Sequence, residues 1–203
     1  MEPYRFRAAG APLLVSMPHV GTYVPGPLLA RLSPAAGALP DTDWHLERLY
    51  DFLDSLDASV LVATHSRYVI DLNRPPDDAN LYPGHDTTGL IPIDTFAKKP
   101  LYAENDAPGE AEIEARRAAI WHPYHAKLAA ELARIRAAHG YALLWDAHSI
   151  LSRVPRFFAG RLPDFNLGTA GGAACGAGLG ERLLAIAARA KGYRAVLNAR
   201  FKG

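Results

Sequence analysis

The stretch "YALLWDAHSI", residues 141–150, is apolar at five of its first six positions and then turns polar at Asp146, His148 and Ser149. A short apolar run of this kind is typical of a buried strand in a parallel sheet. Ligands of open α/β sheets bind beyond the carboxyl ends of the strands. The stretch therefore predicts both a sheet and a functional site at its edge.

The rest of the chain alternates short apolar runs with helical patterns, which indicates an α/β architecture. The expected strands, all central, are residues 12–17, 59–65, 68–72, 141–147 and 193–199. The expected helices are residues 41–56, 108–139 and 175–191, with Gly140 and Gly192 after the last two. Pro123 predicts a kink or break near Trp121. Residues 74–108 are proline-rich and form a long loop of the kind that is often functional.

Composition excludes several classes of protein. The 203 residues suit one domain with a substantial core, and a net charge of +1 gives no footprint for nucleic acid. A single cysteine excludes an intrachain disulfide and a cysteine-based zinc cluster. No run approaches ~20 apolar residues, and the first residues lack the apolar core of a signal peptide, so we expect a cytoplasmic protein without a membrane partner.

Polar residues at the predicted strand ends form a candidate metal-ligand set. His19 follows the first strand and His148 the fourth, while Asp41 and Asp43 open the first helix. Two histidines and a carboxylate are a usual ligand set of catalytic zinc. The spacing of Asp146 and His148 also lets the acid orient the imidazole. Other readings stay open, since Asp41 and Asp43 are good helix N-caps and a lone histidine is often structural.

Other chemistries have weaker signals. His122 and His125 lie three residues apart on one predicted helix, where we expect them on the solvated face. Ser149 lies beside a histidine, but no G-x-S-x-G elbow is present. Cys175 lies at a predicted helix start, where a thiolate would be favoured, although most such cysteines are simply buried.

A second group of residues points to an anionic substrate. In "HSRYVIDLNRPPDDANLY" (65–82), Arg67 and the pair Asn73–Arg74 flank a predicted strand, and Arg153 and Arg156 follow His148. Arginine forks bind carboxylates with two hydrogen bonds, so we expect a small dicarboxylate. The structural alternative is a set of salt bridges from Arg67 and Arg74 to Asp71, Asp77 or Asp78.

Six long motifs, in order along nearly the whole chain, resemble the N-formylglutamate amidohydrolase (N-formylglutamate deformylase) family. They are "LLVSMPHVGTYVP", "ALPDTDWHLERLYDF", "HSRYVIDLNRPPDDANLY", "ALLWDAHSI", "PRFFAGRLPDFNLGT" and "VLNARFKG". The resemblance implies a three-layer fold similar to zinc carboxypeptidases, with a central mixed, mostly parallel sheet flanked by helices. It also implies zinc-dependent hydrolysis of N-formyl-L-glutamate to formate and L-glutamate in histidine degradation.

The resemblance assigns residue roles as well. It implies one Zn²⁺ per chain held by His19, Asp43 and His148. Asp41, close to Asp43 in the sequence, is our reserve ligand. It implies that Arg67 polarises the carbonyl and contributes to substrate binding. Asn73 and Arg74 would hold a carboxylate, and Asp146 would act in catalysis by positioning its neighbours.

The sequence departs from the family at its end. Members continue past "NARFKG" into a segment with a glutamate that is expected to be the general base, whereas this sequence stops at Gly203. We therefore expect residues 1–203 to be a single hydrolase domain lacking its C-terminal segment, with Glu47 and Asp146 as weak replacements for the base. Two alternatives stay open: another metal-dependent acyl-amino-acid or carboxypeptidase-like hydrolase, or an inactive dicarboxylate-binding remnant.

Overall fold

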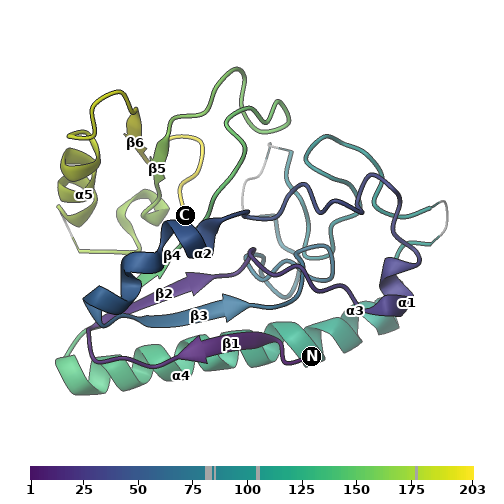
Figure 1. Ribbon diagram of the computed structural model, residues 1–203, viewed down its shortest axis with the longest axis horizontal. Coiled ribbons are helices and arrows are strands. Elements are labelled where there is room, and N and C mark those ends of the chain that lie inside the picture. Colours follow the sequence, from purple (N-terminus) through teal and green to yellow (C-terminus); the bar gives the residue numbers. More distant parts are fainter. Residues whose placement is uncertain (81–83, 85, 104–105, 177) are drawn as a thin grey trace. The chain divides into compact units, whose positions relative to one another are not determined.

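The computed structural model describes residues 1–80, 84, 86–103, 106–176 and 178–203 (Figure 1). The chain divides into two units, Met1–Ile150 and Leu151–Gly203, and each is described by itself. The expected single domain over residues 1–203 stays a prediction. Part of the proline-rich stretch 74–108 lies outside the described residues.

A four-stranded sheet forms the centre of the first unit. Its strands are β1 (Tyr4–Arg7), β2 (Leu13–Met17), β3 (Ser59–Ala63) and β4 (Leu143–Asp146), in the spatial order β1-β3-β2-β4. Strand β2 runs parallel to both β3 and β4, and β1 runs antiparallel to β3. The predicted mixed, mostly parallel sheet is confirmed.

Three of the predicted strands lie in this sheet, and one predicted strand is wrong. Strand β4 forms an edge instead of the centre, and Leu143 and Leu144 are 43% and 44% exposed. Residues 68–72 are almost fully buried but form turns instead of a strand. The Val69 N–H donates to Ser66 O, and the Asp71 N–H donates to Leu90 O in the following loop. The apolar run here reflects burial and not sheet pairing.

Helices cover both faces of the sheet. On one face lies α4 (His122–His139) (Figure 1). Its residues Tyr124 and Ile135 pack with Leu14 and Leu61. On the other face, Leu46 of α2 (Leu46–Leu49) and Leu53 of η1 (Asp51–Leu56) pack with Val15 and Val62. Successive strand residues point to opposite faces, so each strand contributes to both clusters. The first unit therefore has three layers; a specific likeness to zinc carboxypeptidases stays a prediction.

The long predicted helix is interrupted where Pro123 required it. It consists of α3 (Glu110–Arg116), a π-helical turn η2 (Arg117–Trp121) and α4, and it ends at Gly140 with a φ of 80°. Proline has no N–H to donate to the preceding turn, and the wider π turn occurs there. The predicted glycine stop is confirmed, and the irregularity predicted near Trp121 is a π-helical turn through which the helix continues.

The predicted helix 41–56 is present only from Leu46 onward, as the short helices α2 and η1. A short α1 (Gly26–Leu29) precedes it, and regular helix starts only at Leu46, after His45 with a φ of 64°. The Asp43 N–H donates to His19 O, and the carboxylates of Asp41 and Asp43 accept hydrogen bonds from distant segments. These aspartates are therefore not helix caps.

The second unit contains two short parallel strands, β5 (Phe165–Leu167) and β6 (Ala195–Leu197). It also contains η3 (Ala170–Gly172) and α5 (Leu179–Ala187). The predicted strand at 193–199 is present as β6, but it pairs with β5 and not with the four-stranded sheet. Helix α5 is shorter than the predicted 175–191, so Cys175 is not at its start. Among the helices in the described ranges, none has the length and apolar character needed to cross a membrane.

Candidate metal site

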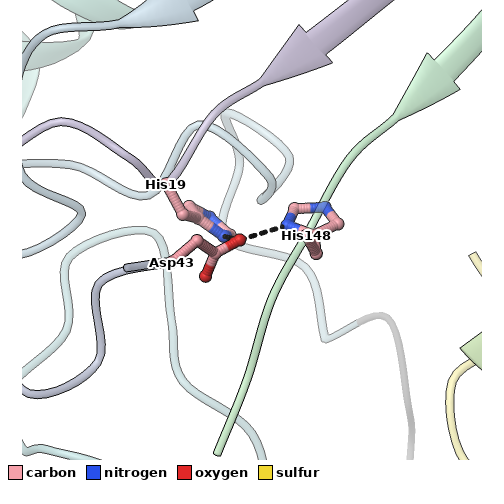
Figure 2. A group of neighbouring side chains, drawn as sticks. All are labelled: His19, Asp43 and His148. Atoms are coloured by element: carbon pink, nitrogen blue, oxygen red, sulfur yellow. Dashed lines mark hydrogen bonds and ion pairs between the residues drawn. The ribbon is translucent and has the colours of Figure 1, made fainter. Parts of the chain in front are cut away.

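His19, Asp43 and His148 come together at the carboxyl edge of the sheet. His19 lies two residues after β2, and His148 lies two residues after its parallel neighbour β4. Asp43 lies on the loop before α2. Figure 2 shows the three side chains turned toward one another. Asp43 Oδ2 is 3.0 Å from His148 Nδ1 and 3.9 Å from His19 Nδ1.

The loop after β2 is fixed by a close approach of two backbones. A Cβ atom on Gly21 would lie 2.3 Å from the carbonyl oxygen of His65, so only glycine fits this position. The Tyr23 N–H donates to Thr64 O, which continues the pairing beyond β3. The sequence "PHVG" therefore keeps His19 beside the end of its own strand.

The three residues lie close enough together that they could hold a single metal ion. One ligand atom from each of the three lies within 4.8 Å of the others. Ligands about 2.0–2.1 Å from a tetrahedral zinc are roughly 3.3 Å apart, which falls between the two measured separations. Two imidazoles and one carboxylate leave one coordination position open. Within the described ranges, this group has the donor set that a catalytic zinc requires.

Asp71 supports His19 from behind. Its Oδ1 atom is 2.7 Å from His19 Nε2, while its Oδ2 accepts a 2.6 Å hydrogen bond from Arg67. Burial acts to raise the pKa of Asp71, but Arg67 and His19 hold it well below its usual range. Burial and the charge of Arg67 lower the pKa of His19, so this imidazole is neutral and its Nδ1 can donate a lone pair.

Asp146 supports His148 in the same way. Asp146 Oδ2 is 3.0 Å from His148 Nε2, and Asn73 Nδ2 is 3.1 Å from the same nitrogen. Burial acts to lower the pKa of His148, but Asp146 and Asp43 raise it to about 10. Each histidine thus has a carboxylate at the nitrogen that faces away from the other ligands. This carboxylate–histidine arrangement is common around metal ions.

Asp41, the reserve ligand, is engaged elsewhere. Its Oδ2 atom accepts hydrogen bonds of 2.8 Å from both the Tyr68 hydroxyl and the Phe96 N–H. Asp43, in contrast, accepts from the Ser149 N–H at 3.0 Å and faces both histidines. The geometry favours Asp43 over Asp41 as the carboxylate of the site.

Arg67 lies inside the site with two of its donor groups loosely occupied. The side chain is buried, and its guanidinium lies over the Phe96 ring at 4.8 Å. One Nη2 hydrogen is bound to Asp71, whereas Nη1 has only long contacts, 3.3 Å to His19 Nδ1 and 3.5 Å to Asp41 O. The sequence alternative of an Arg67–Asp71 salt bridge is confirmed, and the guanidinium also faces the candidate metal site.

Arg74 lies on a neighbouring loop and faces a small cavity. Its Nε and Nη2 donate to the carbonyl and hydroxyl oxygens of Thr88, at 2.7 and 3.2 Å. A cavity of about 200 Å³ opens here, lined by Arg74, Asp78, Ala79, Asn80, Thr87, Thr88 and Gly89. The Asn73 side chain contacts His148 instead of lining this cavity. Asn73 and Arg74, although adjacent in the chain, therefore contact different sites.

The remaining predicted residues lie elsewhere. Arg153 and Arg156 belong to the second unit, and their binding role stays a prediction. Glu47 forms an exposed ion pair with Arg5 and is not in the group of candidate ligands. His125 is expected on the solvated face. Its ring is instead stacked on Trp121, and its Nε2 lies 2.9 Å from Leu72 O.

Several supporting residues were missed by sequence reasoning. The sequence indicates Asp71 only as a salt-bridge partner, and it gives no functional role to Ser16, Tyr124 or Thr88. Asp71 and Ser16 each interrupt an apolar run, in "YVIDL" and "LLVSM". A polar residue at a buried position needs a partner, and this was the signal that could have found them.

Comparisons with known proteins show the family of the chain. The sequence profile of the N-formylglutamate amidohydrolase family matches residues 11–203. The N-formylglutamate deformylase of Pseudomonas aeruginosa is 55% identical over 202 residues, covering 100% of this chain and 76% of that protein. The Pseudomonas putida protein of the same name is 52% identical over 198 residues, covering 98% and 74%.

Solved structures show the same fold. The N-formylglutamate amidohydrolase of Ralstonia eutropha JMP134 superposes with a TM-score of 0.82 at 26% identity, covering 100% of this chain and 78% of that one. A protein of Agrobacterium tumefaciens has the fold at a TM-score of 0.69 and 20% identity, covering 99% and 75%. The chain belongs to the N-formylglutamate amidohydrolase family.

Proposed function

We propose that this protein is a zinc-dependent deformylase that hydrolyses N-formyl-L-glutamate to formate and L-glutamate, in the service of histidine degradation. The names of the relatives support the substrate, and an identity of 55% over the whole chain makes the same reaction the best expectation. The site geometry supports the metal. The reaction breaks the amide C–N bond and forms a C–O bond to a water oxygen, and the amine nitrogen receives a proton.

One observation carries the metal assignment. The Nδ1 atoms of both His19 and His148 face Asp43 Oδ2, and each Nε2 faces a carboxylate, Asp71 or Asp146. A carboxylate at Nε2 keeps a hydrogen on that nitrogen, so Nδ1 is the atom that would bind a metal; in His148 the metal would displace the Nδ1 hydrogen that Asp43 holds in the metal-free protein. A pair of merely structural histidines would not require this duplicated arrangement.

Zinc bound at this site would supply Lewis-acid polarisation of the formyl oxygen and would make a water more acidic. The residues of the chain provide the surroundings. The Nη1 group of Arg67 lies 3.3 Å from His19 Nδ1. From there it would stabilise the negative charge that develops on a carbonyl oxygen bound beside His19. Both oxygens of Asp146 are already engaged, with Ser16 and His148, so we assign it a positioning role.

Recognition of the glutamate part is proposed for Arg74. Its guanidinium is held rigidly by Thr88 at the wall of the 200 Å³ cavity, and a fixed fork loses little entropy when it binds a carboxylate. The formyl group itself is small, so most of the binding energy must come from the two carboxylates. Substrate binding by Arg153 and Arg156 of the second unit stays a separate proposal.

Metal analysis and a substrate panel test the proposal. Protein purified without chelator is expected to contain one zinc per chain, and the His19→Ala, Asp43→Ala and His148→Ala variants are expected to lose it. His122→Ala is the matched control, since His122 is exposed on α4. Formate release is expected from N-formyl-L-glutamate and much less from N-formyl-L-methionine. Full zinc retention in both histidine variants would overturn the metal assignment, and equal rates on the two substrates would overturn the substrate assignment.

A further inference from the structure

A chain of hydrogen bonds runs from helix α4 through the sheet to His148. The Tyr124 hydroxyl is 3.0 Å from Ser16 Oγ, and Ser16 Oγ is 2.8 Å from Asp146 Oδ1. The other oxygen of Asp146 is 3.0 Å from His148 Nε2. Three elements, α4, β2 and β4, therefore contribute one polar group each to this path, which ends on a candidate metal ligand.

The direction of each hydrogen bond follows from the chemistry of the groups. An ionised carboxylate only accepts, so Ser16 must donate its single hydroxyl hydrogen to Asp146. The hydrogen between Tyr124 and Ser16 must then come from the tyrosine. Burial raises the pKa of the Tyr124 phenol, which keeps it in the neutral, donating form. Both hydroxyls thus point their hydrogens toward the site.

The sheet register places this path. Ser16 and Asp146 are directly paired residues of the parallel strands β2 and β4, so their side chains lie on the same face. Ser16 is 3% exposed and Tyr124 is 1% exposed, and burying two hydroxyls is unfavourable unless both are hydrogen-bonded. Asp146, in contrast, is 37% exposed and would be free to turn toward solvent. The buried hydroxyls hold one of its oxygens and leave the other for His148.

We propose that Tyr124 and Ser16 are positioning residues that act through Asp146 to orient the His148 imidazole. The idea rests on the proposed function only in the identity of the ion that His148 would bind. The orientation of the ring is a property of the chain itself and is measured separately. Neither Tyr124 nor Ser16 is placed in contact with the metal or the substrate.

Zinc affinity is the first measurement. In competition with a chromophoric chelator, Ser16→Ala is expected to weaken Zn²⁺ binding about 10-fold, and Tyr124→Phe about 3-fold, because Ser16 still reaches Asp146 in the second variant. The double variant is expected to match Ser16→Ala alone, since Tyr124 acts through Ser16. Tyr102→Phe is the matched control, because Tyr102 is also buried and its hydroxyl has no hydrogen-bond partner among the described residues.

The His148 ring resonances in the metal-free protein are the second measurement. Long-range ¹H–¹⁵N spectra at one fixed pH, assigned with His148→Gln, are expected to show His148 shifted in Ser16→Ala and Tyr124→Phe. They are expected to be unchanged in Tyr102→Phe, with His122 unaffected throughout. Unchanged His148 resonances in both Ser16→Ala and Tyr124→Phe would overturn the proposal. Wild-type protein that binds no Zn²⁺ would overturn the proposed function instead. The spectra alone would then test whether Tyr124 and Ser16 orient the His148 ring.

Discussion

Asp71 Oδ1 lies 2.7 Å from His19 Nε2, and both side chains are buried. The same carboxylate also accepts hydrogen bonds from Arg67 and from the Asn73 N–H, at 2.6 and 2.9 Å. One buried acid therefore links a candidate metal ligand, the arginine beside it and the turn that carries Asn73. Removing its charge is expected to affect both metal binding and folding.

Asp71→Asn is expected to weaken zinc binding about 10–100-fold, because His19 loses the carboxylate that orients it. It is also expected to lower the free energy of unfolding by roughly 3–5 kcal/mol, since Arg67 is left buried without its ion pair. Chelator competition and urea unfolding measure the two effects. As a control, Asp54→Asn removes the surface partner of Arg7 and is expected to cost less than about 1 kcal/mol. Wild-type zinc affinity in Asp71→Asn would contradict the assigned role.

The two aspartates before α2 are expected to behave differently. Asp43→Ala is expected to abolish zinc binding. Asp41→Ala is expected to retain zinc but to destabilise the fold by about 1–3 kcal/mol for each donor left unpaired, because Tyr68 and Phe96 lose their common acceptor. Zinc content and unfolding curves of both variants make the comparison. The reverse pattern would make Asp41 the ligand.

Arg67 and Arg74 are expected to separate kinetically. Arg67→Ala is expected to lower kcat about 10²–10³-fold with little change in KM, as for loss of an oxyanion donor. Arg74→Ala is expected to raise KM mainly, because it removes a ground-state carboxylate contact. Arg67→Lys, which keeps a positive charge beside Asp71, controls for misfolding and is expected to retain the fold but not the full rate. A KM effect in Arg67→Lys with wild-type kcat would contradict this division.

The turn η2 and helix α4 also support the turn that carries Arg74. The Trp121 Nε1–H donates to Arg74 O, and His125 Nε2 lies 2.9 Å from Leu72 O while its ring stacks on Trp121. Trp121→Phe removes one hydrogen bond worth about 1 kcal/mol and is expected to raise KM by less than roughly 10-fold. The effect is expected to vanish in an Arg74→Ala background, since Trp121 acts through that residue. Full additivity of the two changes would show that Trp121 acts elsewhere.

The sequence predicted which residues lie together at the candidate metal site better than it predicted the residues that support them. His19 and His148 were recognisable because each follows an apolar run that does form a strand, and parallel neighbours bring their carboxyl ends together. The antiparallel strand β1 was missed, because a four-residue strand with alternating exposure carries little signal. Burial alone also made residues 68–72 read as a strand, since periodicity cannot separate a buried turn from a buried strand.

The supporting residues were hidden for a different physical reason. Each supporting residue has a partner far away in the chain. Ser16 and Tyr124 are 108 positions apart, and His19 and Asp71 are 52 positions apart. Such pairs depend on strand register and helix placement, which local patterns do not specify. A lone polar residue inside an apolar run reveals that a partner exists but not which residue it is.

The last prediction concerns acid stability. Glu131 of α4 is 3% exposed and accepts hydrogen bonds from Arg134 and from Ser59 Oγ, the latter at 2.6 Å. The hydrogen bonds from Arg134 are the main cause that lowers the pKa of Glu131. A lowered folded-state pKa means that the stabilisation is present above the unfolded value of about 4.3 and is lost as the pH falls through the folded value.

Glu131→Gln is therefore expected to destabilise the protein by about 1–3 kcal/mol at pH 7 and by clearly less at pH 3. Urea unfolding at the two pH values measures this, with Glu2→Gln, an exposed position, as the control that is expected to show no difference. A Glu131→Gln deficit that is the same at both pH values would mean that packing, and not the charge of Glu131, stabilises this part of the helix.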